Sequence, residues 1–154
     1  MDAGYDILLK KAAAYTSRQE TCRWAAESKL RVWGASPTQV KSIIAYLEQE
    51  HYIDETRFSK SFASDKFRFN QWGKVKIAQA LEAKRIPASI FQPVLDAMDE
   101  DSYMQAVNEL LEKKLHEITA KNKYEKQGKL INFALRRGFE YAVVERVLNS
   151  NKYE

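Results

Sequence analysis

The sequence predicts an all-α fold built from three tandem three-helix repeats. Three observations indicate it: turn-forming residues are scarce, apolar residues recur at helical spacing, and the pattern of helices returns twice along the chain. Gly and Pro occur only five and three times in 154 residues, which argues against a turn-rich all-β fold. Apolar residues make up 45% of the chain, enough for a buried core.

The first repeat begins with a predicted helix over about residues 3–15. Residues 17–20, SRQE, have the form of a capping box and predict the start of a second helix, which ends at Gly34. Residues 36–37, a hydroxyl cap followed by Pro, predict the start of the third helix. That helix carries an apolar stripe at i, i+3, i+4, i+7 spacing, which has to be buried. The stripe comprises Val40, Ile43, Ile44 and Leu47.

The second repeat follows the same order. Asp54 predicts the start of a helix rich in Phe, Gly73 interrupts it, and a further helix covers about residues 74–85. Pro87 marks the start of the next helix, whose apolar residues are spaced to face inward. The aromatic residues of the first helix are Phe58, Phe62, Phe67 and Phe69, and the inward residues of the last are Ile90, Phe91, Val94, Leu95 and Met98.

The third repeat starts after three acidic residues at 99–101, where the N-terminus of a helix favours negative charge. Two further helices are predicted over about 123–137, ending at Gly138, and over about 141–148. The inward residues of the first helix are Tyr103, Val107, Leu110 and Leu111.

The three repeats can be laid over one another. Residues 33–35, 84–86 and 137–139 each end a middle helix, at spacings of 51 and 53 residues. The positions that then coincide are Val40, Phe91 and Val144, and Ile44, Leu95 and Leu148. We therefore predict repeats over 1–50, 51–99 and 100–154, each too small for an independent core and each leaning on its neighbour. A single irregular helical bundle is the alternative.

Several classes of protein are disfavoured. Cys22 is the only cysteine, so no intramolecular disulfide forms, and no apolar run approaches the roughly 18 residues of a membrane span. Residues 1–10 do not resemble a secretory signal, so we expect a soluble, cytoplasmic protein. His51 and His116 lack metal-ligand spacing, and no phosphate-binding or nucleophile motif occurs. We expect no catalytic, cofactor or metal site, and hence no enzyme.

Two stretches are strongly basic, although the net charge of the chain is only +4 and its pI about 9.1. Residues 57–85 and 113–137 each hold eight basic and two acidic residues, a net charge of +6 each. Basic side chains interleaved with aromatic ones suit a partner that carries phosphate or acidic groups. The candidate partner-binding residues are Arg57, Lys60, Lys66, Arg68, Trp72, Lys74, Lys76, Lys84, Arg85, Arg136 and Arg137.

A structural interpretation stands beside each of these candidates. The Phe residues at i, i+4 spacing favour core packing over base stacking, and Trp72 is the aromatic residue expected to be exposed. The lysines and arginines also fit solvated helix faces, and Arg136 and Arg137 fit the negative end of a helix dipole. The acids at 99–101 are explained by helix capping.

Three segments resemble the RecX family. Residues 52–58, YIDETRF, resemble its YLDDxRFA segment; residues 73–86 resemble its G-x-x-x-I-x-x-x-L-x-x-K-G-I block; and residues 134–139, ALRRGF, resemble its L-x-R-R-G-F ending. Arg85 departs from this pattern, because the family usually has Gly there. In the first repeat the departures are Cys22, Trp24 and Ala25. The resemblance therefore does not predict the surface of that repeat or its contacts.

The resemblance implies an elongated, curved array of three-helix repeats that binds the RecA recombinase, typically within the groove of its filament on DNA. It also implies inhibition of strand exchange, ATP turnover and coprotease action, and so modulation of DNA repair and the SOS response. We expect a monomer with weak binding to single- or double-stranded DNA. The alternatives are an autonomous DNA-binding helical module and a structural scaffold whose charges are all solvated.

Overall fold

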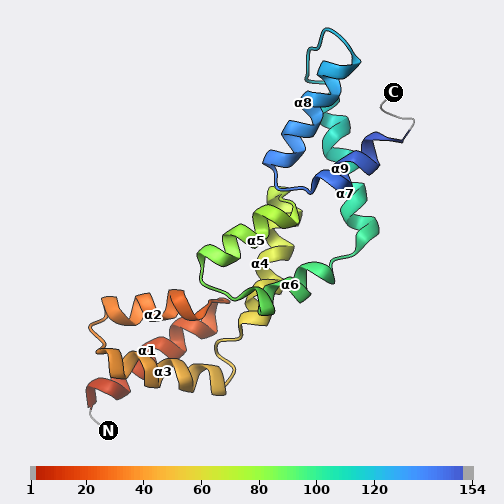
Figure 1. Ribbon diagram of the computed structural model, residues 1–154. Helices are drawn as coiled ribbons and strands as arrows, with labels where there is room; N and C mark the ends of the chain where they lie inside the picture. The colour runs from red at the N-terminus through yellow and green to blue at the C-terminus, as the bar shows by residue number, and fades with distance from the viewer. Residues whose placement is uncertain (1–2, 151–154) are drawn as a thin grey trace. The chain divides into compact units, whose positions relative to one another are not determined.

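The computed structural model describes residues 3–150, which form helices α1 to α9 and contain no strand (Figure 1). The helices are α1 (Ala3–Arg18), α2 (Arg23–Val32), α3 (Pro37–Gln49), α4 (Glu55–Asn70), α5 (Lys74–Ala83), α6 (Ala88–Asp96), α7 (Glu100–Leu115), α8 (Lys123–Arg136) and α9 (Tyr141–Leu148). They confirm the predicted tandem three-helix repeats, and each triplet opens with a helix of 16 residues. The boundaries at 50/51 and 99/100 stay predictions; both lie between helices.

The middle helix of every triplet ends in the same backbone motif. Gly34, Arg85 and Gly138 have φ angles of 89°, 63° and 92°, in the left-handed region. In each case the next amide donates to the carbonyl five residues earlier, as in a Schellman motif. These bonds run from Ala35 to Leu30 (3.0 Å), from Ile86 to Leu81 (3.2 Å) and from Phe139 to Ala134 (3.2 Å). The alignment made from the sequence therefore superimposes equivalent backbone positions.

Most of the predicted helix starts are confirmed. Ser36 and Gln39 form a reciprocal capping box with Pro37 in the first turn of α3. Asp54 accepts the Arg57 N–H at the start of α4, and Asp99 caps α7. The capping box predicted at residues 17–20 is wrong: α1 continues to Arg18, and the Ser17 hydroxyl donates back to the preceding turn.

The chain divides into two compact units. Unit 1 comprises Met1–Phe62 and Leu81–Phe91, and unit 2 comprises Ala63–Ala80 and Gln92–Glu154. Helices α4, α5 and α6 contribute residues to each unit, so the units do not coincide with the repeats. The alternative of a single irregular bundle does not fit this division.

The core of unit 1 lies where α1, α2 and α3 pack against one another (Figure 1). Its buried residues are Ala12, Ala26, Leu30, Val40, Ile43, Ile44, Leu47 and Ile53. All four residues of the stripe predicted on α3 are among them, which explains the register of that helix.

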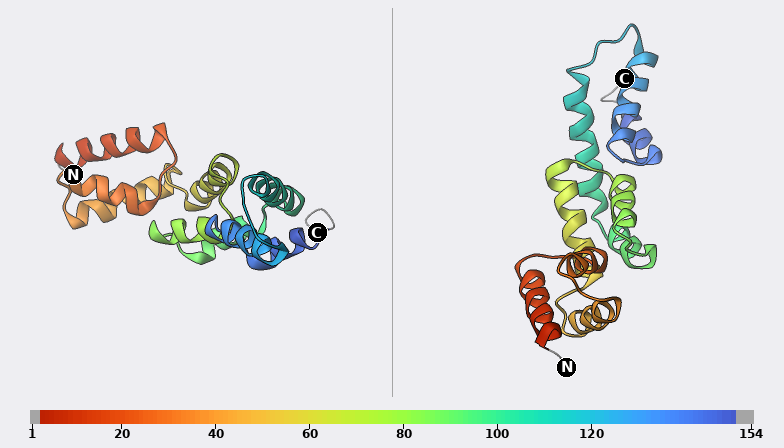
Figure 2. Two further views of the ribbon diagram at one scale, coloured as in Figure 1. Left: turned by 90° about the horizontal axis from the view of Figure 1, so that it is seen from above. Right: turned by 90° about the vertical axis from the view of Figure 1, so that its left-hand side faces the viewer.

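The core of unit 2 lies among α7, α8 and α9, and Figure 2 shows α7 and α8 side by side. Its buried residues are Tyr103, Val107, Leu110, Leu111, Leu130, Ala134, Phe139, Val144, Val147 and Leu148. Within residues 3–150, none of the helices combines the length and apolar character that a membrane crossing requires.

Candidate partner interface

The eleven candidate residues are divided between the two units. Unit 1 holds Arg57, Lys60, Lys84 and Arg85, and unit 2 holds Lys66, Arg68, Trp72, Lys74, Lys76, Arg136 and Arg137. The structure brings together the larger set, because it joins the middle of the first basic stretch to the end of the second within unit 2.

Trp72 is the centre of this set, and we call Lys66, Trp72 and Lys76 the Trp72 cluster. The Nζ atoms of Lys66 and Lys76 lie 5.0 Å and 4.8 Å from the Trp72 ring centroid. The ring is half-buried rather than exposed, contrary to the expectation from the sequence. Cation–π attraction therefore concentrates two positive charges around one aromatic side chain.

The two basic stretches meet backbone to backbone at the end of α8 and the start of α5, which we call the α8–α5 joint. The Gly73 N–H donates to the Arg137 carbonyl (2.7 Å), and the Val75 N–H donates to the Gly138 carbonyl (2.9 Å). The N–H of Lys74 donates to the Tyr103 hydroxyl (2.9 Å). Three amides at the start of α5, those of Gly73, Lys74 and Val75, are thus hydrogen-bonded by other parts of the protein.

Two glycines allow this close approach. A Cβ at Gly73 would lie less than 3.0 Å from backbone atoms of Gly138 and Phe139. A Cβ at Gly138, whose φ is also positive, would meet the Cβ and backbone nitrogen of Lys76. Both positions require the absence of a side chain, which gives the glycines of the two family-like segments a shared physical role.

Tyr103 contacts the α8–α5 joint through both its ring and its hydroxyl. Its ring is 2% exposed, packs against Phe67 and Phe139 at centroid distances of 5.7 and 5.3 Å, and carries the Lys74 ammonium 4.8 Å from its centre. Its hydroxyl donates to the carboxylate of Glu140. Burial, followed by the hydrogen bond to Glu140, raises the pKa of Tyr103, so the phenol stays neutral and keeps donating.

The arginines at the joint have different roles. Arg137 donates from Nη1 to the Asn70 carbonyl (3.0 Å) and so ties the end of α8 to the end of α4. Arg136 is exposed and bonds only weakly to the Asn132 carbonyl of its own helix (3.4 Å). Arg68 is also exposed and lies over Phe69, an aromatic residue with 73% of its surface exposed. The contacts of these three exposed residues, Arg68, Phe69 and Arg136, therefore stay within their own helices.

In unit 1, the residues predicted to bind a partner mostly make internal contacts. Arg57 donates from Nε to Glu20 (2.6 Å) and from Nη2 to the His51 carbonyl (3.1 Å), which ties α4 to the segment between α1 and α2 and to the turn after α3. Lys84 lies 5.7 Å from the Phe62 ring centroid, and Arg85 lies 6.0 Å from that of Trp24. Lys60 is exposed on α4.

Three residues at or near the joint were not candidates in the sequence analysis: Tyr103 was expected only as a core residue, Glu140 was not singled out, and Phe69 was named only as one of the aromatic residues of its helix. The spacing of apolar residues indicates which face is buried but not which hydroxyl meets which carboxylate. Lys74 and Lys76, which also fitted a solvated helix face, are half-buried, and their ammonium groups lie over the rings of Tyr103 and Trp72.

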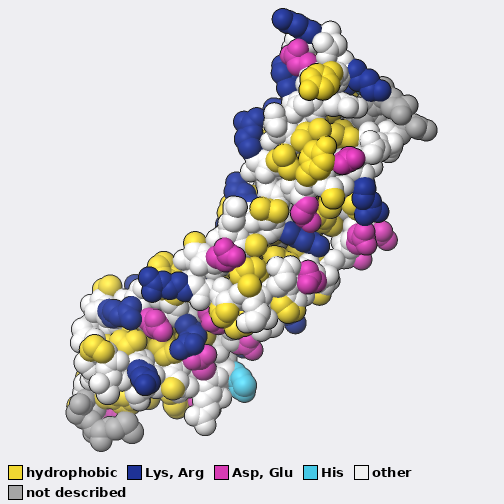
Figure 3. All heavy atoms as spheres, in the orientation of Figure 1, with side chains coloured by type: hydrophobic (Ala, Val, Ile, Leu, Met, Phe, Trp, Pro, Cys, Tyr) yellow, Lys and Arg dark blue, Asp and Glu magenta, His cyan; other side chains and the backbone are white. Residues whose placement is uncertain are grey.

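Charge is unevenly distributed on the surface. On the face drawn in Figure 3, Lys and Arg side chains over α1 to α3 are interspersed with Asp and Glu. Over α8, basic side chains follow one edge of the helix. Within the described part of the chain, no group of three or more His, Cys, Asp or Glu residues is arranged to hold a metal ion.

Two family models match the chain. The model described as RecX, second three-helix domain, matches residues 54–95, and the model described as RecX, third three-helix domain, matches residues 100–148. Together they span more than half of the sequence. The first contains Gly73 and the second contains Tyr103, Arg137, Gly138 and Glu140, so both halves of the α8–α5 joint lie in matched regions.

Individual relatives carry the same family name. The chain is 30% identical over 128 residues to the regulatory protein RecX of Clostridium tetani, a match covering 81% of this chain and 58% of that protein. It is 26% identical over 141 residues to the regulatory protein RecX of Ralstonia nicotianae, covering 92% and 86%. A RecX of Clostridium botulinum is covered over 57% of its length, so the chain spans less than three fifths of these clostridial relatives.

Solved structures share the fold. The crystal structure of RecX from Lactobacillus salivarius superimposes with a TM-score of 0.88 at 21% identity, over 94% of each chain. A crystal structure described as regulatory protein RecX superimposes with a TM-score of 0.86 at 18% identity, over 96% of this chain and 72% of the other. At this identity the likeness concerns the arrangement of helices.

Proposed function

The chain belongs to the RecX family, and on this basis we propose that it is a non-enzymatic regulator that binds the RecA recombinase or its filament. The proposed effect is inhibition of the recombinase, ATPase and coprotease activities of RecA, which modulates DNA repair and the SOS response. We propose that it acts in the cytoplasm as a monomer, without a cofactor.

The observation that supports a macromolecular partner is the basic surface around the α8–α5 joint. It combines the Trp72 cluster with exposed Arg68, Phe69 and Arg136. Arginine and aromatic side chains are the residue types that contribute most to protein interfaces. We propose that this surface contacts acidic groups of RecA, with electrostatic attraction raising the rate of encounter.

Two features favour a protein partner over bare DNA as the main target. Three amides at the start of α5 already donate to other parts of the protein, so they are not available to a phosphate. Both lysines of the Trp72 cluster lie over the indole ring, which leaves less of it for stacking on a base. Autonomous DNA binding therefore remains the second candidate, supported by the two +6 stretches alone.

The test is a titration of the purified protein into RecA assembled on single-stranded DNA while ATP hydrolysis is followed. We expect inhibition at micromolar protein. The double variant Lys66→Glu/Lys76→Glu reverses both charges of the Trp72 cluster and should weaken inhibition by about tenfold or more. The matched control is Lys10→Glu/Lys41→Glu, which makes the same change in net charge at two exposed positions of unit 1.

The outcomes separate the candidates. Inhibition by wild type and control but not by the cluster variant supports the proposal, whereas no inhibition by the wild type at micromolar protein contradicts it. A gel-shift salt series without RecA examines the second candidate, because phosphate contacts give affinity that falls steeply with salt. Tight and strongly salt-dependent binding in that series would favour an autonomous DNA-binding module.

A further inference from the structure

The connection between α7 and α8, in unit 2, carries a part of the second basic stretch that the proposed interface does not use. Residues 113–129, which we call the α7–α8 tip, hold six lysines and two glutamates. Their net charge of +4, with His116 neutral, equals that of the whole chain. On the face drawn in Figure 3, basic side chains gather where α8 begins. A strongly basic surface therefore lies here as well as around the α8–α5 joint.

The two glutamates of the α7–α8 tip are compensated within it. Glu117 lies 3.8 Å from Lys114, and Glu125 lies 3.2 Å from Lys129. Three other lysines of the tip have ammonium groups with neither an ion pair nor a hydrogen bond to the residues that the structure describes: Lys121, Lys123 and Lys126. The first two are exposed, and the third is half-buried. Their positive charge is thus available to an anionic partner.

A groove lies beside these lysines. Its volume is about 340 Å³, at the lower end of the range for binding pockets, which suits one large side chain. The lining residues come from the end of α7, the connection and the start of α8: Leu115, Ile118, Ala120, Asn122, Lys123 and Lys126. The three apolar residues among them are half-buried. The groove therefore combines aliphatic walls with positive charge, and it suits an apolar group flanked by negative charge.

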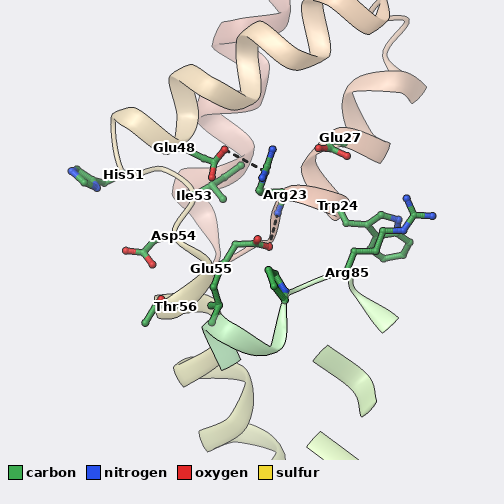
Figure 4. A pocket seen from close by; sticks show the side chains of 12 residues that line it. Arg23, Trp24, Glu27, Glu48, His51, Ile53, Asp54, Glu55, Thr56 and Arg85 are labelled. Atoms are coloured by element: carbon green, nitrogen blue, oxygen red, sulfur yellow. Dashed lines mark hydrogen bonds and ion pairs between the residues drawn. The ribbon is translucent and has the colours of Figure 1, made fainter. Parts of the chain in front are cut away.

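The larger cleft of unit 1 does not offer uncompensated charge of this kind. Figure 4 shows the Arg23 side chain directed at Glu48, at 3.3 Å, and the Glu55 carboxylate at the Arg23 backbone N–H, which it accepts at 3.3 Å. Glu27 lies 3.8 Å from Arg31. Burial also raises the pKa of Glu55, which favours its neutral form. The charged groups of that cleft therefore satisfy one another, whereas the three lysines of the α7–α8 tip do not.

The lining of the groove favours a protein segment over a nucleic acid. Bases stack on aromatic rings, whereas the walls of this groove are aliphatic. The side-chain oxygen of Asn122 accepts the Glu125 N–H at 2.8 Å, so it is not free to accept from the edge of a base. Tyr124, which follows the lining residue Lys123, is 89% exposed, and tyrosine is enriched in interfaces between proteins.

We propose that the groove receives an apolar side chain of about the size of leucine from an acidic protein segment, whose carboxylates meet Lys121, Lys123 and Lys126. Lysine is a compact charge on a flexible stem, so the three ammonium groups can follow carboxylates at several positions of an extended segment. This contact is additional to the Trp72 cluster, and attraction between opposite charges would act at both surfaces. That the segment belongs to RecA rests on the proposed function, but its acidic and apolar character does not.

The experiment uses the full chain and the peptide acetyl-Asp-Asp-Leu-Asp-Asp-amide as the probe, followed by nitrogen-15 NMR spectra of the backbone amides. We expect the peptide to shift the signals of residues 115–126 and to bind more weakly as salt is raised, because exposed charges are screened. Serine in place of the leucine should weaken binding about tenfold, since the buried apolar area is lost. Asparagine in place of the aspartates should weaken it by a similar factor.

The double variant Lys121→Gln/Lys123→Gln removes the two exposed charges and should weaken peptide binding about fivefold or more. The matched control, Lys10→Gln/Lys41→Gln, makes the same change in net charge at two exposed positions of unit 1 and should bind the peptide as the wild type does. All four positions are exposed, so both variants should keep the helical circular dichroism of the wild type.

Saturating peptide without shifts in residues 115–126 would overturn the inference, as would equal binding by the two double variants. Tighter binding of oligothymidylate than of the peptide to these residues, compared at about 150 mM salt, would overturn it in favour of a nucleic-acid contact. The result is separable from the proposed function: peptide binding without inhibition of RecA counts against the function alone, and inhibition without peptide binding counts against the groove alone.

Discussion

Gly73 has a strict steric requirement in the α8–α5 joint. A methyl group there would overlap backbone atoms of Gly138 and Phe139, which have no flexible end to move aside. We expect Gly73→Ala to lower the free energy of unfolding by about 2–4 kcal/mol, the range for overpacking combined with loss of buried hydrogen bonds. Urea denaturation followed by circular dichroism measures the loss.

Gly128 provides the control for this prediction. It lies inside α8, and a Cβ there would meet no atom within 4 Å. Replacement of an interior helical glycine by Ala reduces the freedom of the unfolded chain, so Gly128→Ala should raise the free energy of unfolding by about 0.5–1 kcal/mol. Equal effects of the two substitutions would contradict the close approach at Gly73.

Glu55 gives a second prediction at this scale, because its raised pKa makes stability depend on pH. As pH rises above the ordinary value of 4.5, the unfolded chain releases this proton before the folded chain does, so the contribution of Glu55 to stability declines. Glu55→Gln cannot ionise. The variant should therefore gain stability relative to wild type between about pH 4 and about pH 7. Paired urea titrations at the two pH values measure the difference, and a constant difference would be the contrary outcome.

The character of the candidate residues was predictable from the sequence, but their contacts were not. Arg57 and Arg137 both lie in basic stretches, yet each donates to backbone carbonyls of neighbouring segments. Charge indicates that a side chain can bind an acceptor, whereas the choice between an internal carbonyl and a partner depends on packing between distant segments. Arg136, the neighbour of Arg137, is exposed, although the two residues are equivalent in the sequence pattern.

At the scale of helices, capping explains most of the boundaries. The Ser36 hydroxyl oxygen accepts the Gln39 N–H at 3.2 Å, and the Ser36 N–H donates to Gln39 Oε1 at 2.9 Å. Ser36→Ala should therefore cost about 1 kcal/mol of unfolding free energy. Thr38→Ala, two residues further along the chain and exposed, should cost only a few tenths of a kcal/mol. Thermal unfolding of both variants provides the comparison, and equal melting temperatures would argue against the cap.

The failure at residues 17–20 has a physical cause. A serine followed three residues later by glutamate fits a capping box, but the same hydroxyl can bond back to a carbonyl inside a helix. Here the Ser17 hydroxyl donates to the Ala14 carbonyl, while the Glu20 carboxylate forms an ion pair with Arg57. The partner of Glu20 lies 37 residues away, so short-range spacing had no means of detecting it.

At the scale of the whole chain, the division into two compact units predicts local effects of core substitutions. Leu111 is fully buried among α7, α8 and α9 in unit 2. Leu111→Ala should lower stability by about 2–5 kcal/mol through the cavity that it leaves. Hydrogen exchange should show the loss of protection at the amides of Val107 and Leu130, with a smaller change at Leu47 in the core of unit 1. An equal loss in both cores would show that the units unfold as one.

The number and order of helices were predictable at this scale because each repeat has the same order of helix-ending residues and apolar stripes. The grouping of the helices was not. Residues 63–80 of the middle repeat belong to unit 2 while residues 81–91 belong to unit 1, and the contacts that decide this, such as Gly73 with Arg137, are non-local. No periodicity within a repeat encodes them.

The α8–α5 joint has a consequence for the order in which the protein matures on the ribosome. Asn70 and Arg137 are separated by 67 positions, so the start of α5 is synthesised long before the carbonyls that complete it. Until the third repeat emerges and folds, the first turn of α5 depends on water for its hydrogen bonds. In a nascent chain stalled after two repeats, the first turn of α5 would therefore be frayed. Synthesis of the third repeat would then supply the carbonyls and the hydroxyl that order this turn.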